Sequence, residues 1–459
     1  MWKTVRAIVW TLRIALPKVA TGWMFALLTI DFNRVAIFEL GIAAIVVTTL
    51  LSIHYFMAPF QVVIGRIADT MPLFGYRRTP YLLLGSLVAS LLFLALPTVA
   101  MGMGEGSAVA MLSGIVLFTV FGLSMAVIAD TYHSLIAEVT TPETRGLVIS
   151  VVWIVLIMST ILATVVMNIV RPEFSPEAMQ NLYNLTPLIV LGSTLLGVVG
   201  MERRMNAEEL EEARLKARAL APPGNPLSSA FKLLRQNAQT RAFFAFIFLA
   251  IFSIFLQENI IEVFGAEVFA MSITETSTLQ RYWAGGVLIG MVLTGVVSYA
   301  LKISRKKLVI TGLIGCAATF LLLGFSSLLE IEAVVPPILF VMGLFIGMFN
   351  VGALALMMEM TVANATGLYM GLWGTAQAFG MGLSSVGSGA LHTALISGGV
   401  LEPSHAYFGI FVLEAAGLML ACYILYRVSV SRFAAKAVGS VKNGRSSESP
   451  VSAGSTARA

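Results

Sequence analysis

The chain has 459 residues, of which 58% are hydrophobic and only 12% are charged, and its formal net charge is +5. A soluble domain carries roughly 25% charged residues, so this composition excludes a soluble globular protein. Many apolar runs reach about 20 residues, enough to cross a hydrocarbon core of about 30 Å, and they lack the alternation of membrane β-strands. The fold class is therefore predicted to be an all-α membrane protein.

We predict twelve transmembrane helices, at 17–38, 41–63, 81–101, 107–129, 146–169, 184–201, 242–262, 280–301, 307–328, 334–358, 367–392 and 406–427. If the N-terminus lies in the cytoplasm, 26 of the 29 Lys and Arg residues fall on the cytoplasmic side. By the positive-inside rule, both termini are then cytoplasmic. The positive charge is explained by topology, and nucleic-acid binding explains it poorly.

The first elements are a basic arm and a polar first span. The arm, 1–16, has the residue spacing of a helix that lies in the membrane interface. Span 1 contains Trp23 and then Asp31, Asn33 and Arg34. Charges at membrane depth cost at least about 2.5 kcal/mol each and usually mark function. Asp31 and Arg34 are three residues apart and could pair on a helix. They form either a structural ion pair or the polar lining of a cavity.

Two histidines lie in or near the next spans. His54 is in span 2, and His133 is near the expected cytoplasmic end of span 4. Neutral imidazole can bind the metal of a macrocycle, so both are candidate ligands of such a metal. A histidine inside a membrane protein is more often a hydrogen-bonded packing residue, and this alternative stays open.

The loop between spans 2 and 3 has its own motif. Gly65 and Asp69 are followed by Arg77 and Arg78. The glycine lets span 2 approach a neighbour closely. Asp69 could pair with a positive group at the helix ends, and Arg145 is the candidate.

The chain contains an internal repeat. Leu135–Leu147 reads LIAEVTTPETRGL, and Leu356–Leu368, 221 residues later, reads LMMEMTVANATGL, so that Glu138 corresponds to Glu359. Each copy ends one span and opens the next. Two six-span halves joined by a long basic loop are typical of the major facilitator superfamily. The motif of Gly65 and Asp69 resembles the loop signature of that superfamily, although the second half lacks the aspartate.

This organisation divides the chain into four parts. They are an N-terminal six-helix half with its basic arm (1–201), a cytoplasmic linker (202–241), a C-terminal six-helix half (242–427) and a cytoplasmic tail (428–459) that we expect to be disordered. Within the linker, 206–220 is predicted to form a surface helix that Asn206 caps. Gly286–Gly290 and Gly367–Gly371 have the GxxxG spacing of closely packed membrane helices.

The connection between spans 7 and 8 is the most unusual segment. It reads LQENIIEVFGAEVFAMSITETSTLQRYW over 256–283, with acids alternating with apolar residues. A simple connector would be short and rich in Gly, Pro, Asn and Ser. The pattern predicts that something packs on this segment, so 257–275 is a candidate docking surface. The candidate residues of this segment are Gln257, Glu258, Asn259, Glu262, Phe264, Glu267, Phe269 and Trp283.

Span 1 (22–41) and the 256–276 segment are similar to the PucC/LhaA group, the bacteriochlorophyll delivery family of the major facilitator superfamily. The similarity runs from the basic arm to span 12. This sequence departs from the family pattern, with Glu258 and Val263 where Asp and Pro are expected, and with Ala266 and Ala270 where glycines are common.

The resemblance implies a role in assembling the light-harvesting complexes of phototrophic bacteria. The chain would deliver chlorophyll or bacteriochlorophyll, a magnesium tetrapyrrole, to antenna polypeptides, or would chaperone their assembly. The implied partners are antenna or photosystem polypeptides, with pigment-synthesis enzymes as further candidates. The implied location is a bacterial inner membrane, whether cytoplasmic, intracytoplasmic or thylakoid.

Two other functions stay open. One is a proton-coupled transporter of a small solute, with a cavity lined by Asp31, Arg34, Gln257 and Glu258. The other is an antenna-assembly scaffold that binds no pigment. The sequence has no P-loop and no hydrolase or metalloprotease motif. We therefore expect no enzyme activity, no catalytic residue and no metal site built from protein side chains.

Overall fold

A computed structural model describes residues 2–58, 60–206, 208–212, 215, 234–235, 237–301, 303–360, 366–430 and 432–433. Helices dominate these ranges, and the β-structure within them is one isolated bridge between Leu73 and Tyr76. The expected all-α architecture is therefore confirmed.

The N-terminal half begins with a helical run that changes from α-helical to π-helical hydrogen bonding. This first helical run is made of α1 (Trp2–Ala15), α2 (Pro17–Ala26) and two π-helical segments, η1 (Leu27–Phe32) and η2 (Val35–Glu39). The remaining helices of this half are α3 (Ala44–Phe56), α4 (Phe60–Thr70), α5 (Thr79–Gly104), α6 (Ala108–Val139), α7 (Pro142–Val170), α8 (Pro176–Asn184) and α9 (Thr186–Val198).

The C-terminal half contains one short helix among long ones. Its elements are α12 (Ala238–Phe255), the short α13 (Ile261–Phe269), α14 (Ile273–Leu301), α15 (Arg305–Leu328), the 3₁₀ turn η3 (Glu332–Val334), α16 (Val335–Glu359), α17 (Thr366–His392), the π-helical η4 (Thr393–Ser397) and α18 (Pro403–Arg427). Proline in the first turn starts two of these helices, α16 and α18, where its missing N–H removes no intrahelical bond.

Nine helices within the described ranges are long and apolar enough to cross a membrane. The three expected spans outside this set are still helical. The span expected at 41–63 is divided into α3 and α4, whereas those at 280–301 and 367–392 lie within α14 and α17. The chain is thus a multi-pass membrane protein, and the number twelve stays a prediction.

Two span boundaries differ from expectation. The span expected at 184–201 begins earlier, as α8 and α9 cover 176–198. The span expected at 242–262 ends at Phe255 as α12, because the polar run Gln257–Asn259 forms a turn instead of continuing the helix.

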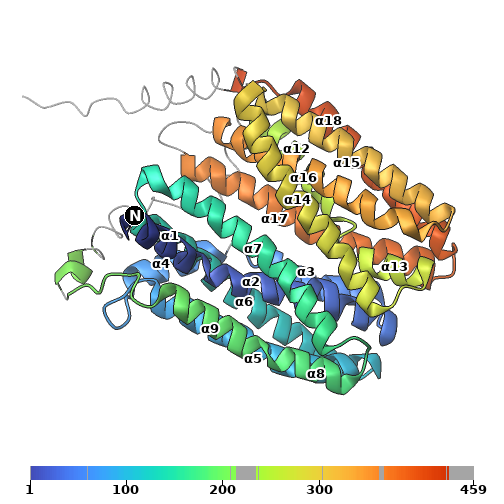
Figure 1. Ribbon diagram of the computed structural model, residues 1–459, viewed down its shortest axis with the longest axis horizontal. Coiled ribbons are helices and arrows are strands. Elements are labelled where there is room, and N and C mark those ends of the chain that lie inside the picture. The colour runs from blue at the N-terminus through green and yellow to red at the C-terminus, as the bar shows by residue number, and fades with distance from the viewer. Residues whose placement is uncertain are drawn as a thin grey trace, which may run out of the picture.

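The two halves have separate hydrophobic cores. Residues 14–198 supply almost all of one core, and residues 243–433 supply the other. In Figure 1 the blue-to-green half lies below the yellow-to-red half. The halves meet where α3 packs on α17 and where α7 packs on α14. We call this contact the seam.

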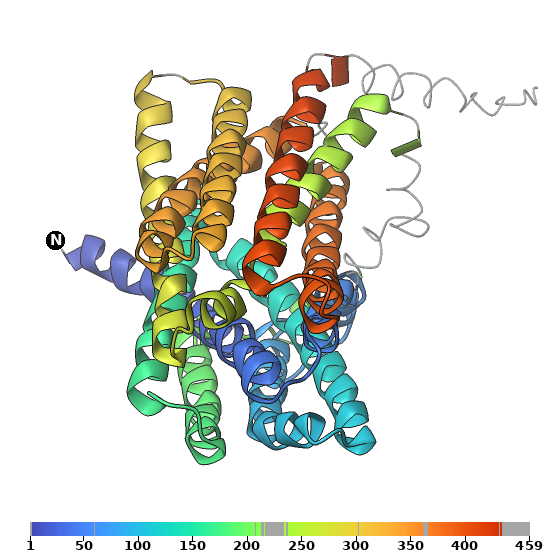
Figure 2. The same ribbon diagram turned by 90° about the vertical axis from the view of Figure 1, so that its right-hand side faces the viewer.

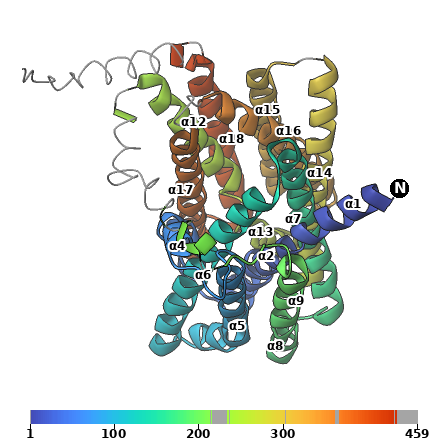
Figure 3. The ribbon, with the colours of Figure 1, turned by 90° about the vertical axis from the view of Figure 1, so that its left-hand side faces the viewer.

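Figure 2 shows the short helix α13 at the junction between the halves. It packs against η2 of the first half and against α14 and α18 of its own half. We refer to this end of the molecule, which topology predicts to be extracytoplasmic, as the α13 end. Figure 3, from the opposite end, shows α1 projecting beyond the bundle.

Close helix packing occurs where GxxxG spacing predicted it. A Cβ atom added to Gly286 would collide with the backbone carbonyl of Phe340, and one added to Gly290 would collide with the backbone of Leu344. Backbone contact of this kind is the function of small residues in membrane helices. The two glycines of the second GxxxG pair, Gly367 and Gly371, are described only by their helical backbone.

The start of the linker is bound to the loop between α4 and α5. The Glu202 carboxylate accepts hydrogen bonds from the backbone N–H groups of Arg77, Arg78 and Thr79, at the N-terminus of α5. The expected cap at Asn206 is confirmed, since its Oδ1 accepts a hydrogen bond from the Glu209 N–H at 2.8 Å. Most of the expected surface helix and nearly all of the tail lie outside the described residues.

Candidate functional site

Two π-helical segments shape the end of the first span. The segments η1 and η2, with the residues between them, carry Asp31, Asn33 and Arg34, and all three side chains are buried. π-helical turns are rare and occur frequently at functional sites. This polar stretch is therefore the first component of the candidate site.

The acid and base of this stretch do not pair with each other, contrary to expectation. The Asp31 carboxylate pairs with Arg171, at the end of α7, and accepts a hydrogen bond from the Tyr183 hydroxyl at 3.1 Å. Arg34 pairs instead with Glu39, five residues further along. A π-helix brings residues i and i+5 into register, whereas the expectation assumed an α-helix.

Arg171 is a site residue that the sequence analysis did not single out. The signal that could have identified it is a lone arginine at the outer end of an apolar span, opposite a buried acid. Trp23, which was expected to belong to the polar stretch, contacts a different helix. Its Nε1 donates to the Thr186 hydroxyl of α9 at 3.0 Å.

The segment after α12 is the second component of the site, and it is not the exposed surface that we expected. Gln257, Asn259, Glu262 and Phe264 are all at most 5% exposed. Its apolar residues pack into the cores of both halves, which carries the intervening polar side chains inside. The residues from Leu256 to Ile260 form turns that connect the end of α12 to α13.

A chain of hydrogen bonds connects the two components across the seam. The Asn33 amide donates to the Asn259 carbonyl oxygen at 2.5 Å, and the Asn259 amide donates to the Ser385 hydroxyl at 2.9 Å. The Ser385 hydroxyl in turn donates to the carbonyl of Thr48 in α3 at 2.8 Å. The end of the first span and the turn after α12, which lie near the starts of the two halves and 226 residues apart, therefore meet at one place.

A second pair of polar contacts joins the halves near the α13 end. The Ser277 hydroxyl contacts Asn168 Oδ1 at 2.6 Å, and the Thr274 hydroxyl donates to the Pro172 carbonyl at 2.8 Å. Nearby, the N–H and the hydroxyl of Ser272 both donate to the exposed Glu275 carboxylate, and they hold its pKa below the ordinary value.

Glu267 belongs to an internal polar cluster. His392 Nε2 lies 3.0 Å from one of its carboxylate oxygens, and the Tyr407 hydroxyl donates to the same carboxylate at 2.8 Å. The Phe264 ring lies beside this cluster, with its centroid 5.0 Å from that of Tyr407 and 5.2 Å from that of Phe269. These contacts attach α13 to α17 and α18. Trp283 lies within α14 and is partly buried against the core of the second half.

The two candidate pigment ligands have different surroundings. The Nδ1 atom of His54 lies 2.6 Å from the Leu51 carbonyl oxygen, while Nε2 is buried and has no protein partner. The rings of Phe25 and Phe121 lie 5.2 and 6.2 Å from the His54 imidazole. His133 is exposed on the surface of α6.

The repeated glutamates make corresponding contacts in the two halves. Glu138, at the end of α6, accepts a hydrogen bond from Arg78 Nε at 2.9 Å and lies 3.7 Å from Arg77 Nη1. Glu359, at the end of α16, pairs with Arg305. The side chains of the remaining signature residues, Gly65, Asp69 and Arg145, lie outside the described part of the structure, and so does the pair expected between the last two.

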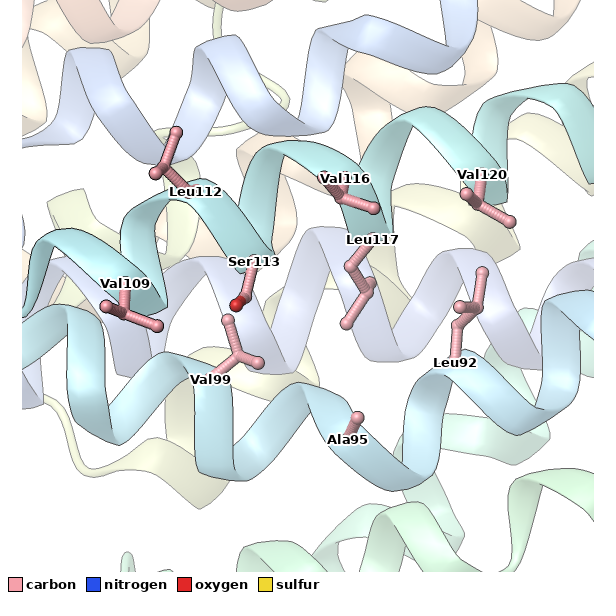
Figure 4. A pocket seen from close by; sticks show the side chains of 9 residues that line it. All are labelled: Leu92, Ala95, Val99, Val109, Leu112, Ser113, Val116, Leu117 and Val120. Carbon is pink, nitrogen blue, oxygen red and sulfur yellow. The ribbon is translucent and has the colours of Figure 1, made fainter.

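A groove of about 530 Å³ lies on the outside of the first half, between α5 and α6 (Figure 4). Its walls are aliphatic apart from the Ser113 hydroxyl, and none of the candidate residues lines it. Such a surface suits the acyl chains of lipids. Within the described residues, no group of three or more His, Cys, Asp or Glu side chains is arranged to hold a metal ion.

Comparison with known sequences shows a family match over most of the chain. The sequence model of a family described as "PUCC protein" matches residues 31–433. The "Bacteriochlorophyll synthase 44.5 kDa chain" of Rhodobacter capsulatus is 27% identical over 431 residues, which are 92% of this chain and 96% of that protein. "Protein PucC" of Cereibacter sphaeroides is 26% identical over 443 residues, 93% of each chain.

Comparison with solved structures shows the fold. A mutant form of the nucleoside transporter NupG superposes with a TM-score of 0.69 at 14% identity, over 91% of this chain and 99% of the transporter. A D-xylose-proton symporter gives a TM-score of 0.65 at 15% identity, over 89% of this chain and 96% of the symporter. The expected major facilitator superfamily fold is therefore confirmed.

Proposed function

Because the chain belongs to the PucC protein family, we propose that it is an assembly factor for light-harvesting complexes. The observation that carries this proposal is the family match over residues 31–433, which includes both the polar end of span 1 and the segment around α13. The name of the relative from Rhodobacter capsulatus refers to bacteriochlorophyll, which supports a pigment as the cargo. The proposed partners are antenna or photosystem polypeptides, with pigment-synthesis enzymes as further candidates.

A chlorophyll-type pigment would need an uncharged ligand for its magnesium, and His54 has the right chemistry. A carbonyl oxygen can only accept, so the Nδ1 atom of His54 carries the proton and Nε2 keeps a free lone pair. A hydrogen bond of this type commonly orients a metal-binding histidine. When bound, the magnesium of the pigment would accept this lone pair. His133 remains an alternative ligand that a pigment could reach from the lipid.

We propose that this chain is not itself an enzyme, although one relative is named as a synthase chain. The fold is that of secondary transporters, and candidate residues such as Asn33 and Glu267 are hydrogen-bonded into the packing of the halves. In this proposal the chain carries or positions a pigment that other proteins synthesise. Both termini would face the cytoplasm, and the membrane would be the one in which the antenna is assembled.

The first test is purification of the full chain from pigment-making cells in a mild detergent, followed by its absorption spectrum. We expect a chlorophyll-type band in stoichiometric amount, which His54→Ala reduces strongly and His133→Ala does not. If His133→Ala alone removes the band, the ligand assignment to His54 is wrong. Co-purification of antenna polypeptides without any pigment would favour the scaffold function instead.

The transporter function is tested separately. Fold similarity to a D-xylose-proton symporter is the observation in its favour, but at 15% identity it shows the fold alone. A strain that lacks the gene should lose antenna absorbance and recover it on complementation. Normal antenna absorbance in the deletion strain, together with solute uptake driven by a pH gradient in vesicles, would replace the assembly function with the transporter function.

A further inference from the structure

Three buried oxygen atoms in and near the turn after α12 have no donor in the described part of the protein. Oδ1 of Asn33, Oε1 of Gln257 and Oε2 of Glu262 are all buried and unpartnered. The side chains that carry them are at most 3% exposed. Asn33 donates a hydrogen bond to the Asn259 carbonyl oxygen, so its amide lies beside the turn that contains Gln257. Buried acceptors without partners are costly, and a donor or a cation would satisfy them. The buried Nε of Arg34 also has no partner.

The charges around this turn are also unbalanced. Glu258 and Glu262 interact electrostatically with each other, and Arg34 is the cation that interacts with Glu262. Arg34 is already paired with Glu39. Glu39 and Glu262 therefore both interact with this one guanidinium, and Glu258 interacts with Glu262. The local charge is negative when all three carboxyl groups are ionised. Glu262 is buried and Glu258 is half-buried, and two neighbouring carboxylates in such a place are stabilised when one of them binds a cation.

The backbone provides a third, independent reason for a cation. The helix α12 ends at Phe255, and the short helix α13 begins at Ile261 after a turn, so the helix is interrupted here. The C-terminal end of α12 carries the negative end of its dipole, which favours positive charge. In secondary transporters, broken helices of this kind supply backbone and side-chain oxygens to Na⁺ or H⁺.

We propose that Glu258 and Glu262, with the amide oxygens of Asn33 and Gln257, bind one monovalent cation, a proton or Na⁺. Because Asn33 belongs to the first half and the other three residues to the second, occupancy strengthens the contact between the halves at the seam. This inference does not depend on pigment binding, and it adds to the proposed assembly function a link between the seam and an ion gradient.

The test measures the thermal unfolding midpoint of the purified full chain in nanodiscs. The midpoint is recorded from acidic to alkaline pH in NaCl, KCl or choline chloride at constant ionic strength. If the ion is a proton, the midpoint falls as pH rises, because the buried carboxyl loses its proton, and the three salts give the same curve. If the ion is Na⁺, NaCl raises the midpoint selectively at alkaline pH.

Variants assign the effect to this site. Glu262→Gln and, independently, Glu258→Gln replace a carboxyl by a neutral group, so each should abolish the pH or Na⁺ dependence. Glu275→Gln, at an exposed carboxyl of α14, should leave it unchanged. A pH or Na⁺ dependence that both site variants retain would overturn the proposal, as would a wild-type midpoint that responds to neither ion.

One further variant separates this site from a neighbouring titration. His392 of α17 and Tyr407 of α18 contact α13 through their bonds to Glu267, and α18 also carries the buried acid Glu414. Tyr55 of α3 interacts with Glu258, and Arg281 lies on α14. His392→Gln should keep the dependence on pH or Na⁺. If His392→Gln abolishes the dependence while Glu262→Gln keeps it, the histidine is responsible and the proposal fails.

Discussion

The buried pair between Asp31 and Arg171 offers a quantitative test of how span 1 is held in the first half. The two side chains are 1% and 3% exposed, and Tyr183 donates a further hydrogen bond to Asp31. Removing one member of a buried pair leaves the other charge uncompensated, which typically costs about 3–5 kcal/mol. We therefore expect Asp31→Ala and Arg171→Ala each to lower the free energy of unfolding by about this amount.

The double variant should cost less than the sum of the single variants. With both charges removed, neither is left buried and unpaired, so the coupling energy should reach about 2–3 kcal/mol. The measurement is a double-mutant cycle on the unfolding equilibrium of the purified protein in detergent micelles. Expression, helical content and monodispersity of each variant must be compared first, because a misfolded variant gives no equilibrium.

A matched control is available in the same chain. Arg203 and Glu209 also pair, but their side chains are 82% and 36% exposed. Exposed pairs are worth about 0–1 kcal/mol, so the corresponding cycle should give a coupling energy in that range. Equal coupling energies for the buried and the exposed pair, or additive effects at Asp31 and Arg171, would refute the reasoning that burial determines the strength of this pair.

Three further predictions concern packing and backbone. Ala270 has a left-handed backbone with φ 55° at the end of α13, so Ala270→Gly should stabilise the protein by about 0.5–1 kcal/mol; an unchanged or lower unfolding midpoint would contradict this. Gly286→Ala should destabilise the α14–α16 contact by about 1–3 kcal/mol. Gly285→Ala is the control and should not, because the space around Gly285 is open. Similar unfolding midpoints for the two variants would refute the close-packing explanation. Tyr407→Phe removes the hydrogen bond to Glu267 and should cost about 1.5–3 kcal/mol in unfolding free energy, with a wild-type value as the contrary result.

The interior position of the α13 segment changes how its acids should be tested. If the segment were an exposed surface, charge reversal of Glu262 and Glu267 would affect docking and leave the fold intact. Glu262 is instead 1% exposed, and Glu267 bonds to His392 and Tyr407. Charge reversal would bury a lysine without a partner, so loss of antenna assembly could then reflect unfolding. Neutral, isosteric changes such as Glu262→Gln are the informative ones.

Composition and local pattern were enough to establish the class of the molecule. The low charge and the long apolar runs required membrane helices, because an unsatisfied backbone in lipid is costly. The repeat of Glu138 and Glu359 at a fixed offset indicated two related halves, and both glutamates pair with arginines of corresponding loops. The spacing of Gly286 and Gly290 predicted close packing, because that requirement is local to one helix face.

The partners of the charged residues were decided only by the tertiary structure. Sequence spacing placed Asp31 beside Arg34, but the π-helical register and the approach of α7 gave each a different partner, 140 and five residues away respectively. The segment after α12 was expected to be a docking surface because its acids alternate with apolar residues in a long connection between two spans. Whether its polar side chains face water or the interior depends on where η2, α14 and α18 pack around it. That arrangement arises from contacts between distant parts of the chain, so the residue pattern within the segment could not predict it.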